Sequence, residues 1–287
     1  MKAIIKLLRP HQYVKNLFIF APILFAFSFT TVNFINTLVA FVLFSLIASS
    51  VYILNDLMDI QEDKAHPKKK FRPIASGEVS TKTAKYLFIT LSSLSLILAF
   101  LFSVKLFSVL VAYFLLNISY SLKLKHISIV DIFIISTGFV LRLFAGSVAT
   151  GIELSMWIII MTFLLALFLS LAKRRDDVLL SLEGKDTRKN IDGYNLEFVN
   201  ATMVLMSGVV VVSYILYTIS EGVTLRLHTE YLYLTSFFVI LGIFRYMQLT
   251  FVENNSGSPS KIVVKDTFMK ITIILWIFSF IAIIKFI

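Results

Sequence analysis

The sequence predicts an all-α, polytopic membrane protein. Of its 287 residues, 58% are hydrophobic and 15% are charged, whereas soluble domains are about 45–50% apolar and about 25% charged. Apolar runs of about 20 residues recur along the chain, which is the length that a helix needs to cross a ~30 Å hydrocarbon core. A soluble helical protein would need polar faces at helical spacing, but Leu91–Phe102 and Trp157–Leu171 contain no charged residue at all.

Nine candidate spans follow one another, and together they predict a single transmembrane domain over residues 1–287. The first is expected to be retained, because it is too long for the apolar part of a signal peptide and no small-residue cleavage site follows it. A short hairpin near residues 32–34 is expected to join it to the second. The longer connections are 55–83, 173–197 and 250–266. The spans are 16–34, 37–54, 84–102, 106–121, 129–149, 155–172, 198–219, 229–249 and 267–286.

The positions of Lys and Arg indicate the orientation, because cytoplasmic loops carry an excess of both. All but four of the 27 Lys and Arg residues lie on the side of the N-terminus; Lys105, Arg226 and Lys285 lie opposite, and Arg142 lies inside a span. We therefore expect a multi-pass protein of the inner (plasma) membrane, with its N-terminus and active site cytoplasmic. Membrane topology accounts for the net charge of +10, so nucleic acid is not an expected partner. With no cysteine and only four scattered His, neither a thiolate nor a zinc site is expected.

One charged segment, NDLMDIQEDKAHPKKKFRPIASGEVS, runs from Asn55 to Ser80. Asp56, Asp59 and Asp63 are spaced by three and four residues, so a helix would place them within about 60° of one another. Like charges so placed repel, and a cation between them would remove that cost. Mg²⁺ takes oxygen ligands and usually combines one or two carboxylates with substrate phosphates. The pattern favours a Mg²⁺ site with Asn55 as a fourth ligand; the alternative is a solvated acidic helix end balanced by nearby lysines.

Basic residues follow the aspartates at once: Lys64, Lys68, Lys69, Lys70 and Arg72. Metal on one side with ammonium and guanidinium groups on the other suits a diphosphate. The lysines at 68–70 are equally explained as positive loop residues beside anionic lipid. Arg72 precedes Pro73, which restricts its backbone and favours a positioned side chain.

The whole segment resembles the first aspartate-rich motif of the UbiA superfamily of intramembrane prenyltransferases. Further stretches resemble one branch of it, the decaprenyl-phosphate phosphoribosyltransferases: LRPHQYVKN, NISYSLKLKH, FVLRLFAGSVATG, FLLALFLSLAKRRDD and FRYMQL. The resemblance extends over nearly the whole chain. It implies nine transmembrane helices around a central cavity open to the cytoplasm and sideways to lipid, with the loops 55–83 and 173–197 capping the site.

That branch transfers 5-phosphoribose from phosphoribosyl diphosphate to a polyprenyl phosphate, a step toward lipid-linked arabinose in the cell envelope. The resemblance implies the same transfer here, with Mg²⁺ as cofactor and membrane lipids as surroundings. Asp56, Asp59 and Asp63 would hold the metal on the donor's diphosphate. No general base is required, because the attacking phosphate oxygen is already anionic at neutral pH.

A second motif departs from the pattern of the prenyl-transferring relatives, which carry D-x-x-x-D at the start of the other long loop. Here the stretch reads Lys173-Arg174-Arg175-Asp176-Asp177. Lys173 replaces the leading carboxylate, and Asp177 keeps the trailing one. The change favours a site that holds a second anion, with Lys173 as a catalytic residue; alternatively, the three cations simply end a span on its cytoplasmic side.

The remaining site candidates are polar residues near these motifs. Arg142 must face the interior of the bundle, because an unpaired Arg in a span costs at least ~2.5–3.5 kcal/mol; it either pairs structurally or faces the ligand. Tyr120, Lys123 and Lys125 resemble a family loop that faces the donor. The residues expected to bind substrate are Lys15, Asn16, Asn55, Lys70, Arg72, Tyr120, Lys123, Arg142, Arg174, Arg175, Asp177, Arg188 and Tyr194.

Two other functions remain open. Prenyl transfer from a polyprenyl diphosphate to an aromatic or lipid acceptor is disfavoured by the altered second motif. A transporter is disfavoured because its charged residues would gather near the middle of the membrane, whereas here nearly all lie at one face.

Overall fold

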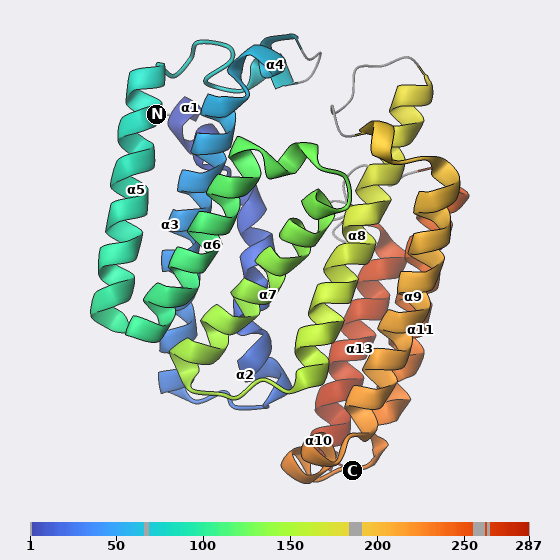
Figure 1. The fold of residues 1–287 in the computed structure, drawn as a ribbon. Coiled ribbons are helices and arrows are strands. Elements are labelled where there is room, and N and C mark those ends of the chain that lie inside the picture. The colour runs from blue at the N-terminus through green and yellow to red at the C-terminus, as the bar shows by residue number, and fades with distance from the viewer. Residues whose placement is uncertain (1, 66–68, 184–190, 255–261, 263–264, 287) are drawn as a thin grey trace. The chain divides into compact units, whose positions relative to one another are not determined.

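The computed structural model describes residues 2–65, 69–183, 191–254, 262 and 265–286 (Figure 1). The described residues form helices joined by turns, without any β-strand. The chain divides into two compact units, Met1–Glu153 and Leu154–Ile287.

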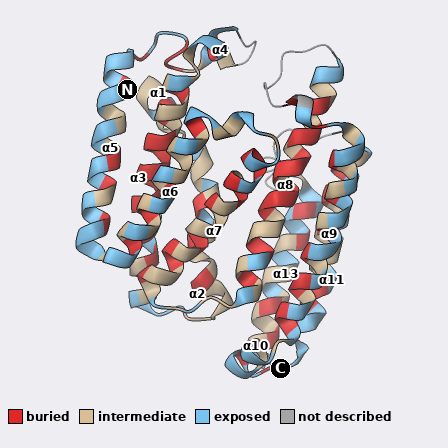
Figure 2. Ribbon diagram, in the orientation of Figure 1, coloured by how far each residue is buried: buried red, intermediate tan, exposed pale blue. Residues whose placement is uncertain are grey.

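The first unit is built around a 28-residue helix, α3 (Thr31–Met58). Before it come α1 (Lys2–Leu8), the 3-10 helix η1 (Pro10–Phe20) and α2 (Ala21–Phe25). After it come α4 (Ile60–Ala65), η2 (Lys69–Phe71), α5 (Thr81–Phe102), α6 (Val104–Leu122), η3 (Leu124–His126) and α7 (Val130–Thr150). In Figure 2, α3 carries many more buried positions than α5, so α3 lies inside the unit and α5 at its edge.

The expected first span, 16–34, is not one continuous helix. Proline begins η1 and also falls in the first turn of α2, and a proline ring inside a helix clashes with the carbonyl four residues earlier. The chain turns just after α2, where Phe27 has a φ of 51°, so the expected hairpin near 32–34 lies earlier. Thr30 then caps α3 by accepting a hydrogen bond from the backbone N–H of Asn33.

Polar side chains inside the unit fix η1 to its neighbours. Tyr13 and Ser49 share a hydrogen bond of 2.8 Å, and the Asn16 side chain donates to Ser45 at 2.9 Å. Gly146 of α7 allows η1 to lie against that helix: a Cβ at position 146 would be 2.0 Å from the carbonyl oxygen of Ile19. Only glycine permits such a close approach of helix and segment.

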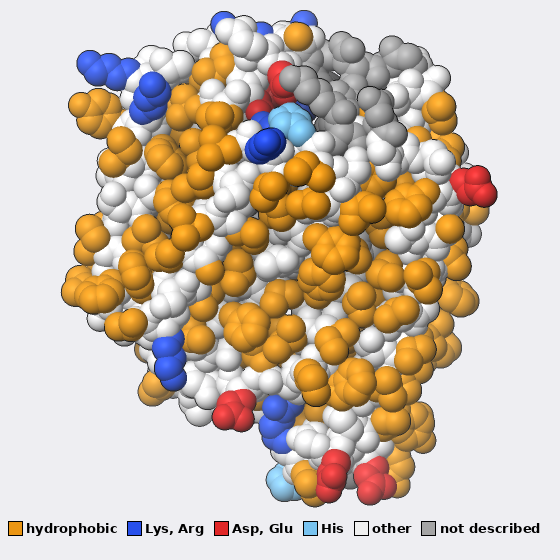
Figure 3. All heavy atoms as spheres, viewed as in Figure 1, with side chains coloured by type: hydrophobic (Ala, Val, Ile, Leu, Met, Phe, Trp, Pro, Cys, Tyr) orange, Lys and Arg blue, Asp and Glu red, His pale blue; other side chains and the backbone are white. Residues whose placement is uncertain are grey.

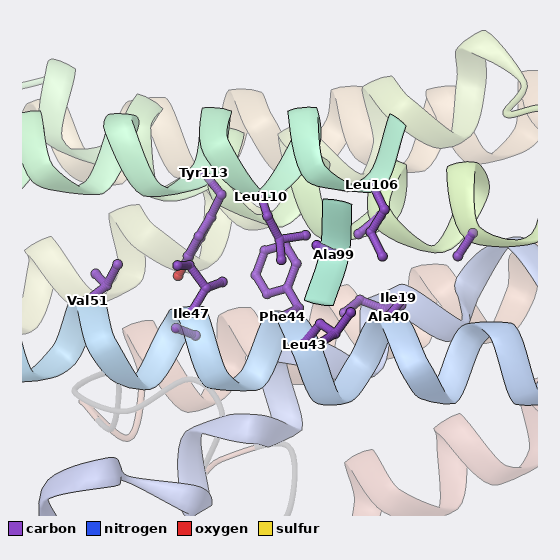
Figure 4. Close-up of a cluster of buried hydrophobic side chains, with 13 residues drawn as sticks. Ile19, Ala40, Leu43, Phe44, Ile47, Val51, Ala99, Leu106, Leu110 and Tyr113 are labelled. Atoms are coloured by element: carbon purple, nitrogen blue, oxygen red, sulfur yellow. The ribbon is translucent and has the colours of Figure 1, made fainter. Parts of the chain in front are cut away.

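Apolar side chains of α3, α5, α6 and α7 fill the interior around Phe44. Figure 4 shows the ring of Phe44 pointing from α3 towards Leu110 of α6. The ring centroid of Phe44 lies 4.5 Å from that of Tyr113. Lipid tails are as apolar as these side chains, so close van der Waals packing holds the cluster together. The cluster forms a frame for the polar groups at the helix ends.

The second unit packs four long helices. They are α8 (Met156–Leu182), α9 (Leu196–Ile219), α11 (Ser236–Phe251) and α13 (Thr267–Phe286), with η4 (Ile191–Gly193), α10 (Glu221–Leu227) and η5 (Tyr231–Thr235) between them. Ser155 and Asn195 cap α8 and α9 with their side chains. Between α13 and α9, Trp276 donates a hydrogen bond of 2.8 Å to the Tyr214 hydroxyl.

Eight helices in the described parts of the chain are long and apolar enough to cross a membrane. They correspond to the second to ninth expected spans, so the expected count of nine is approximate. In Figure 3, most side chains between the helix ends are hydrophobic, while charged side chains gather near the ends. The protein is therefore an all-helical, multi-pass membrane protein, as the sequence predicts.

Candidate active site

Asp56 lies at the buried end of α3, in the last turn of that helix. Its Oδ1 accepts hydrogen bonds from Arg9 and, at 3.1 Å, from Nη1 of Arg72. The same Nη1 donates to Oδ2 of Asp63 at 2.7 Å. Two carboxylates and two guanidinium groups from four separate segments thus meet at one point, which we call the Asp56 cluster: Arg9, Asp56, Asp63 and Arg72.

The loop after α4 holds Arg72 in place. Gly77 has a φ of 81°, a left-handed conformation that side chains with a Cβ rarely adopt. The resulting turns bond Ser76 N–H to the Arg72 carbonyl and Val79 N–H to that of Pro73, both at 2.9 Å. Ile74 and Val79 are buried in an apolar cluster. The segment FRPIASG therefore holds the guanidinium group of Arg72 in a fixed position.

Arg9 lies at the junction of α1 and η1, where its own backbone conformation sets the position of its side chain. Its own φ is 54°, an uncommon conformation for a residue other than glycine. The guanidinium lies 5.3 Å from the ring centroid of Tyr52, an arrangement that favours a cation. This backbone conformation turns the chain into η1 and leaves Arg9 paired with Asp56.

Asp59 does not join the other two carboxylates, so the expectation of three aspartates on one helix face is wrong. The helix α3 ends at Met58, and Asp59 leaves helical geometry with φ −97° and ψ 13°. Its side chain pairs with Lys125 of η3 and accepts a hydrogen bond of 3.2 Å from Asn55. Ser121 approaches the Asn55 side-chain oxygen at 3.5 Å. Across the described residues, no three His, Cys, Asp or Glu side chains are grouped as a metal site.

The chemistry of the Asp56 cluster nevertheless fits a divalent cation. Oδ2 of Asp56 is buried and accepts no hydrogen bond from any described group. Leaving a buried acceptor unsatisfied costs about 1–3 kcal/mol, and a hard cation is the partner that a carboxylate oxygen prefers. Asp63 supplies a second carboxylate to the same cluster, and Mg²⁺ usually combines one or two carboxylates with substrate phosphates.

A second group of cations lies on η1 and α7. Arg142 is buried and donates to the Asn16 side-chain oxygen at 2.8 Å, the Gly138 carbonyl at 2.7 Å and the Tyr113 hydroxyl at 3.2 Å. The predicted site residues Asn16 and Arg142 are therefore brought together. Lys15 is partly buried beside them. Burial, followed by the positive charges of Arg142 and Arg9, lowers the pKa of Lys15 to about 8.

The other candidates of the first unit lie nearer the surface. Lys123 is exposed, and Lys125 is the lysine of that loop that reaches a carboxylate. Lys70 is exposed, with its ammonium 5.3 Å from the ring centroid of Phe71. Tyr120 is partly buried near the end of α6. Of the predicted residues, the structure brings Asp56, Asp63 and Arg72 into direct contact.

In the second unit, the basic run at the end of α8 is divided among different partners. Arg174 is buried and pairs with Asp177 within the same helix. Arg175 donates to Asn200 at 3.0 Å, to the Thr250 carbonyl at 2.7 Å and to Asn254 at 3.0 Å. Lys173 is partly buried and Tyr194 is buried. Arg188 falls outside the described residues.

Arg9 and Tyr113 were not among the predicted site residues, and Lys125 was named only as part of a loop that resembles one facing the donor. Arg9 stands in LRPHQYVKN, and Lys125 belongs to the same loop as Lys123, so both signals were present in quoted motifs. Arg9 is 47 residues from its partner Asp56 in the sequence, and Lys125 is 66 residues from its partner Asp59. In the sequence, Tyr113 is one of many aromatic residues in a predicted span, and no local pattern marks it as a partner of Arg142.

The fold and the Asp56 cluster define an intramembrane transferase, and the comparison with known families agrees. The model of the UbiA prenyltransferase family matches residues 17–274. The chain belongs to that family, and it is a membrane enzyme of the transferase class.

Individual relatives narrow the comparison. The chain is 32% identical to decaprenyl-phosphate phosphoribosyltransferase of Corynebacterium glutamicum, over 96% of this chain and 84% of the relative. It is also 32% identical to that of Mycolicibacterium smegmatis, over 96% and 91%. Among solved structures, a UbiA homologue from Archaeoglobus fulgidus bound to GPP and Mg²⁺ covers 98% of this chain and 99% of its own, with a TM-score of 0.71 at 20% identity. The last likeness shows the fold.

Proposed function

We propose that the protein transfers 5-phosphoribose from phosphoribosyl diphosphate to a polyprenyl phosphate and releases diphosphate. The relatives that share about a third of its residues over nearly its whole length carry the name of that reaction. In this transfer, a phosphate oxygen of the lipid attacks C1 of the ribose while the bond from C1 to the diphosphate oxygen breaks. The lipid oxygen is already ionised, so no side chain has to remove a proton.

The Asp56 cluster suits the leaving group of this reaction. Asp56 and Asp63 would hold Mg²⁺, which when bound would neutralise charge on the departing diphosphate. Arg72 and Arg9 lie directly beside the carboxylates and would bind diphosphate oxygens through charge-assisted hydrogen bonds. Lys125, paired with Asp59, would add a further positive charge. Charge builds up on the diphosphate as the bond breaks, so these contacts strengthen in the transition state.

The choice of donor rests on one observation, the lysine at position 173. A prenyl diphosphate held between two carboxylate motifs needs an acidic residue there, whereas a reaction that joins two phosphorylated substrates needs extra positive charge. Prenyl transfer to an aromatic or lipid acceptor remains the second candidate, because the solved homologue holds a prenyl diphosphate.

A donor assay tests the proposal directly. Membranes containing the protein would be incubated with a polyprenyl phosphate and labelled phosphoribosyl diphosphate, or with a labelled prenyl diphosphate and candidate acceptors, each with Mg²⁺ or with EDTA. We expect a labelled phosphoribosyl lipid that forms only with metal. Labelled product from the prenyl diphosphate alone would refute the proposal.

We also propose that the protein lies in the inner (plasma) membrane with its N-terminus, its long loops and the Asp56 cluster on the cytoplasmic side. The supporting observation is the one-sided distribution of Lys and Arg. A reporter that is active only in the cytoplasm should work when fused after Gly184 and fail near Gly222. The opposite pattern would reverse the orientation.

A further inference from the structure

Lys15 and Arg142 are the two cations of the η1 and α7 group, and among the described residues they differ in their hydrogen-bond partners. Arg142 is surrounded by three neutral acceptors and by the rings of Phe44, Tyr113 and Phe139, whose centroids lie 4.9–5.4 Å from its guanidinium carbon. Lys15 has neither a hydrogen bond nor an ion pair in the described part of the chain.

The surroundings of Lys15 make its charge costly. Its neighbours Arg9 and Arg142 are both cations, and both repel it. The carboxylate of Asp56 is already shared by Arg9 and Arg72. A partly buried ammonium without a counter-charge is destabilising unless a ligand supplies one.

Lys15 is also held in position. The residue after it, Asn16, is buried and bonded on one side to Ser45 of α3 and on the other to Arg142 of α7. Tyr13, two residues before it, bonds to Ser49 of α3. The backbone on both sides of Lys15 is thereby fixed, and its partly buried side chain starts from a defined position close to Arg142.

We propose that Lys15, with the positive charge of Arg142 behind it, binds a phosphomonoester group, separately from the diphosphate held by the Asp56 cluster. This inference rests on the proposed function, in which both substrates carry such a group: the 5-phosphate of the ribose and the phosphate of the lipid. Both are anions with several acceptor oxygens, and an ammonium is a suitable point charge for either.

The experiment compares Lys15→Met and Lys15→Arg with the unmodified protein purified in detergent. Lys2→Met is the matched control, because Lys2 is an exposed lysine of the same N-terminal segment. Thermal stabilisation would be titrated with three probes: ribose 5-phosphate, a short-chain polyprenyl phosphate, and inorganic diphosphate with Mg²⁺. The first two probes distinguish the donor's phosphate from the lipid's phosphate.

We expect Lys15→Met to weaken binding of one monoester probe by roughly 10- to 150-fold, the range for losing a hydrogen bond to a charged group. Diphosphate binding should stay unchanged, and Lys15→Arg should retain most of the monoester affinity. Without ligand, Lys15→Met should melt at a higher temperature than the unmodified protein, because it removes an unbalanced charge. A purely structural lysine would give the opposite shift.

Three outcomes would overturn the inference: unchanged affinity for both monoesters, equal losses for monoester and diphosphate, or a lower melting temperature of ligand-free Lys15→Met. None of them depends on catalytic turnover. The donor assay described above decides the proposed function independently, so failure of one can be told from failure of the other.

Discussion

The C-terminal ends of α3 and α8 carry the two charged motifs of the chain, and the charged side chains of the two motifs have different partners. At the end of α3, Asp56 and Asp63 meet Arg9 and Arg72, which come from other segments. One buried oxygen of Asp56 accepts no hydrogen bond from any described group. At the end of α8, Arg175 is directed to neutral groups of α9 and of the end of α11.

This difference shows that position in a motif does not by itself assign a role. The α3 motif gathers opposite charges around an acceptor that can still bind a cation, and this arrangement supports the proposed metal site. Two residues of the α8 motif have structural contacts instead: Arg174 closes an ion pair within its helix, and Arg175 fastens three segments together. Lys173 is therefore the residue of the α8 motif whose substitution can distinguish the two candidate donors.

The largest effect is expected at Asp56. Asp56→Asn keeps the shape of the side chain but removes its charge, so it should lower kcat by about 100- to 1,000-fold, as for other residues that stabilise transition-state charge. Glu78→Gln, an exposed carboxylate in the same region, should leave activity unchanged. Both would be assayed at limiting Mg²⁺ after size-exclusion chromatography confirms folding. If Asp56→Asn kept most of its activity, the α3 end would not be the metal site.

Much of this comparison could be predicted from the sequence, because it depends on local patterns. Span length and hydropathy fix the helices from α3 to α13, and the spacing of the aspartates marks the α3 end. The partners could not be predicted: Arg142 meets Asn16 across 126 residues. The shape of the first span could not be predicted either, because hydropathy does not register how two prolines and Gly146 let η1 depart from a regular helix.

A smaller effect is expected at Lys173, where two substitutions separate the two donors. If Lys173 serves a phosphate, Lys173→Ala should weaken binding of the phosphorylated substrates by roughly 10- to 150-fold. Lys173→Asp should be worse, because it places a negative charge among anionic ligands. The values of KM would be measured for both variants with both donors. Higher prenyl transfer by Lys173→Asp than by the unmodified protein, with no phosphoribosyl transfer by either, would end the proposed function.

The smallest effect on catalysis is expected at Arg175, although the sequence predicted it to bind substrate. Its guanidinium joins α8 to Asn200 of α9 and to the Thr250 carbonyl of α11. Arg175→Met should therefore lower Tm, by the equivalent of about 1.5–3 kcal/mol, while KM changes little.

A double-mutant cycle with Asn200→Ala sharpens this prediction about the α8 end. If the two side chains stabilise the protein through their mutual contact, the loss in the double variant should be smaller than the sum of the two single losses. Additive losses in stability, together with a raised KM for either substrate in Arg175→Met, would show that Arg175 acts on a ligand. The α8 end would then resemble the α3 end, and Arg175 would return to the candidate active site.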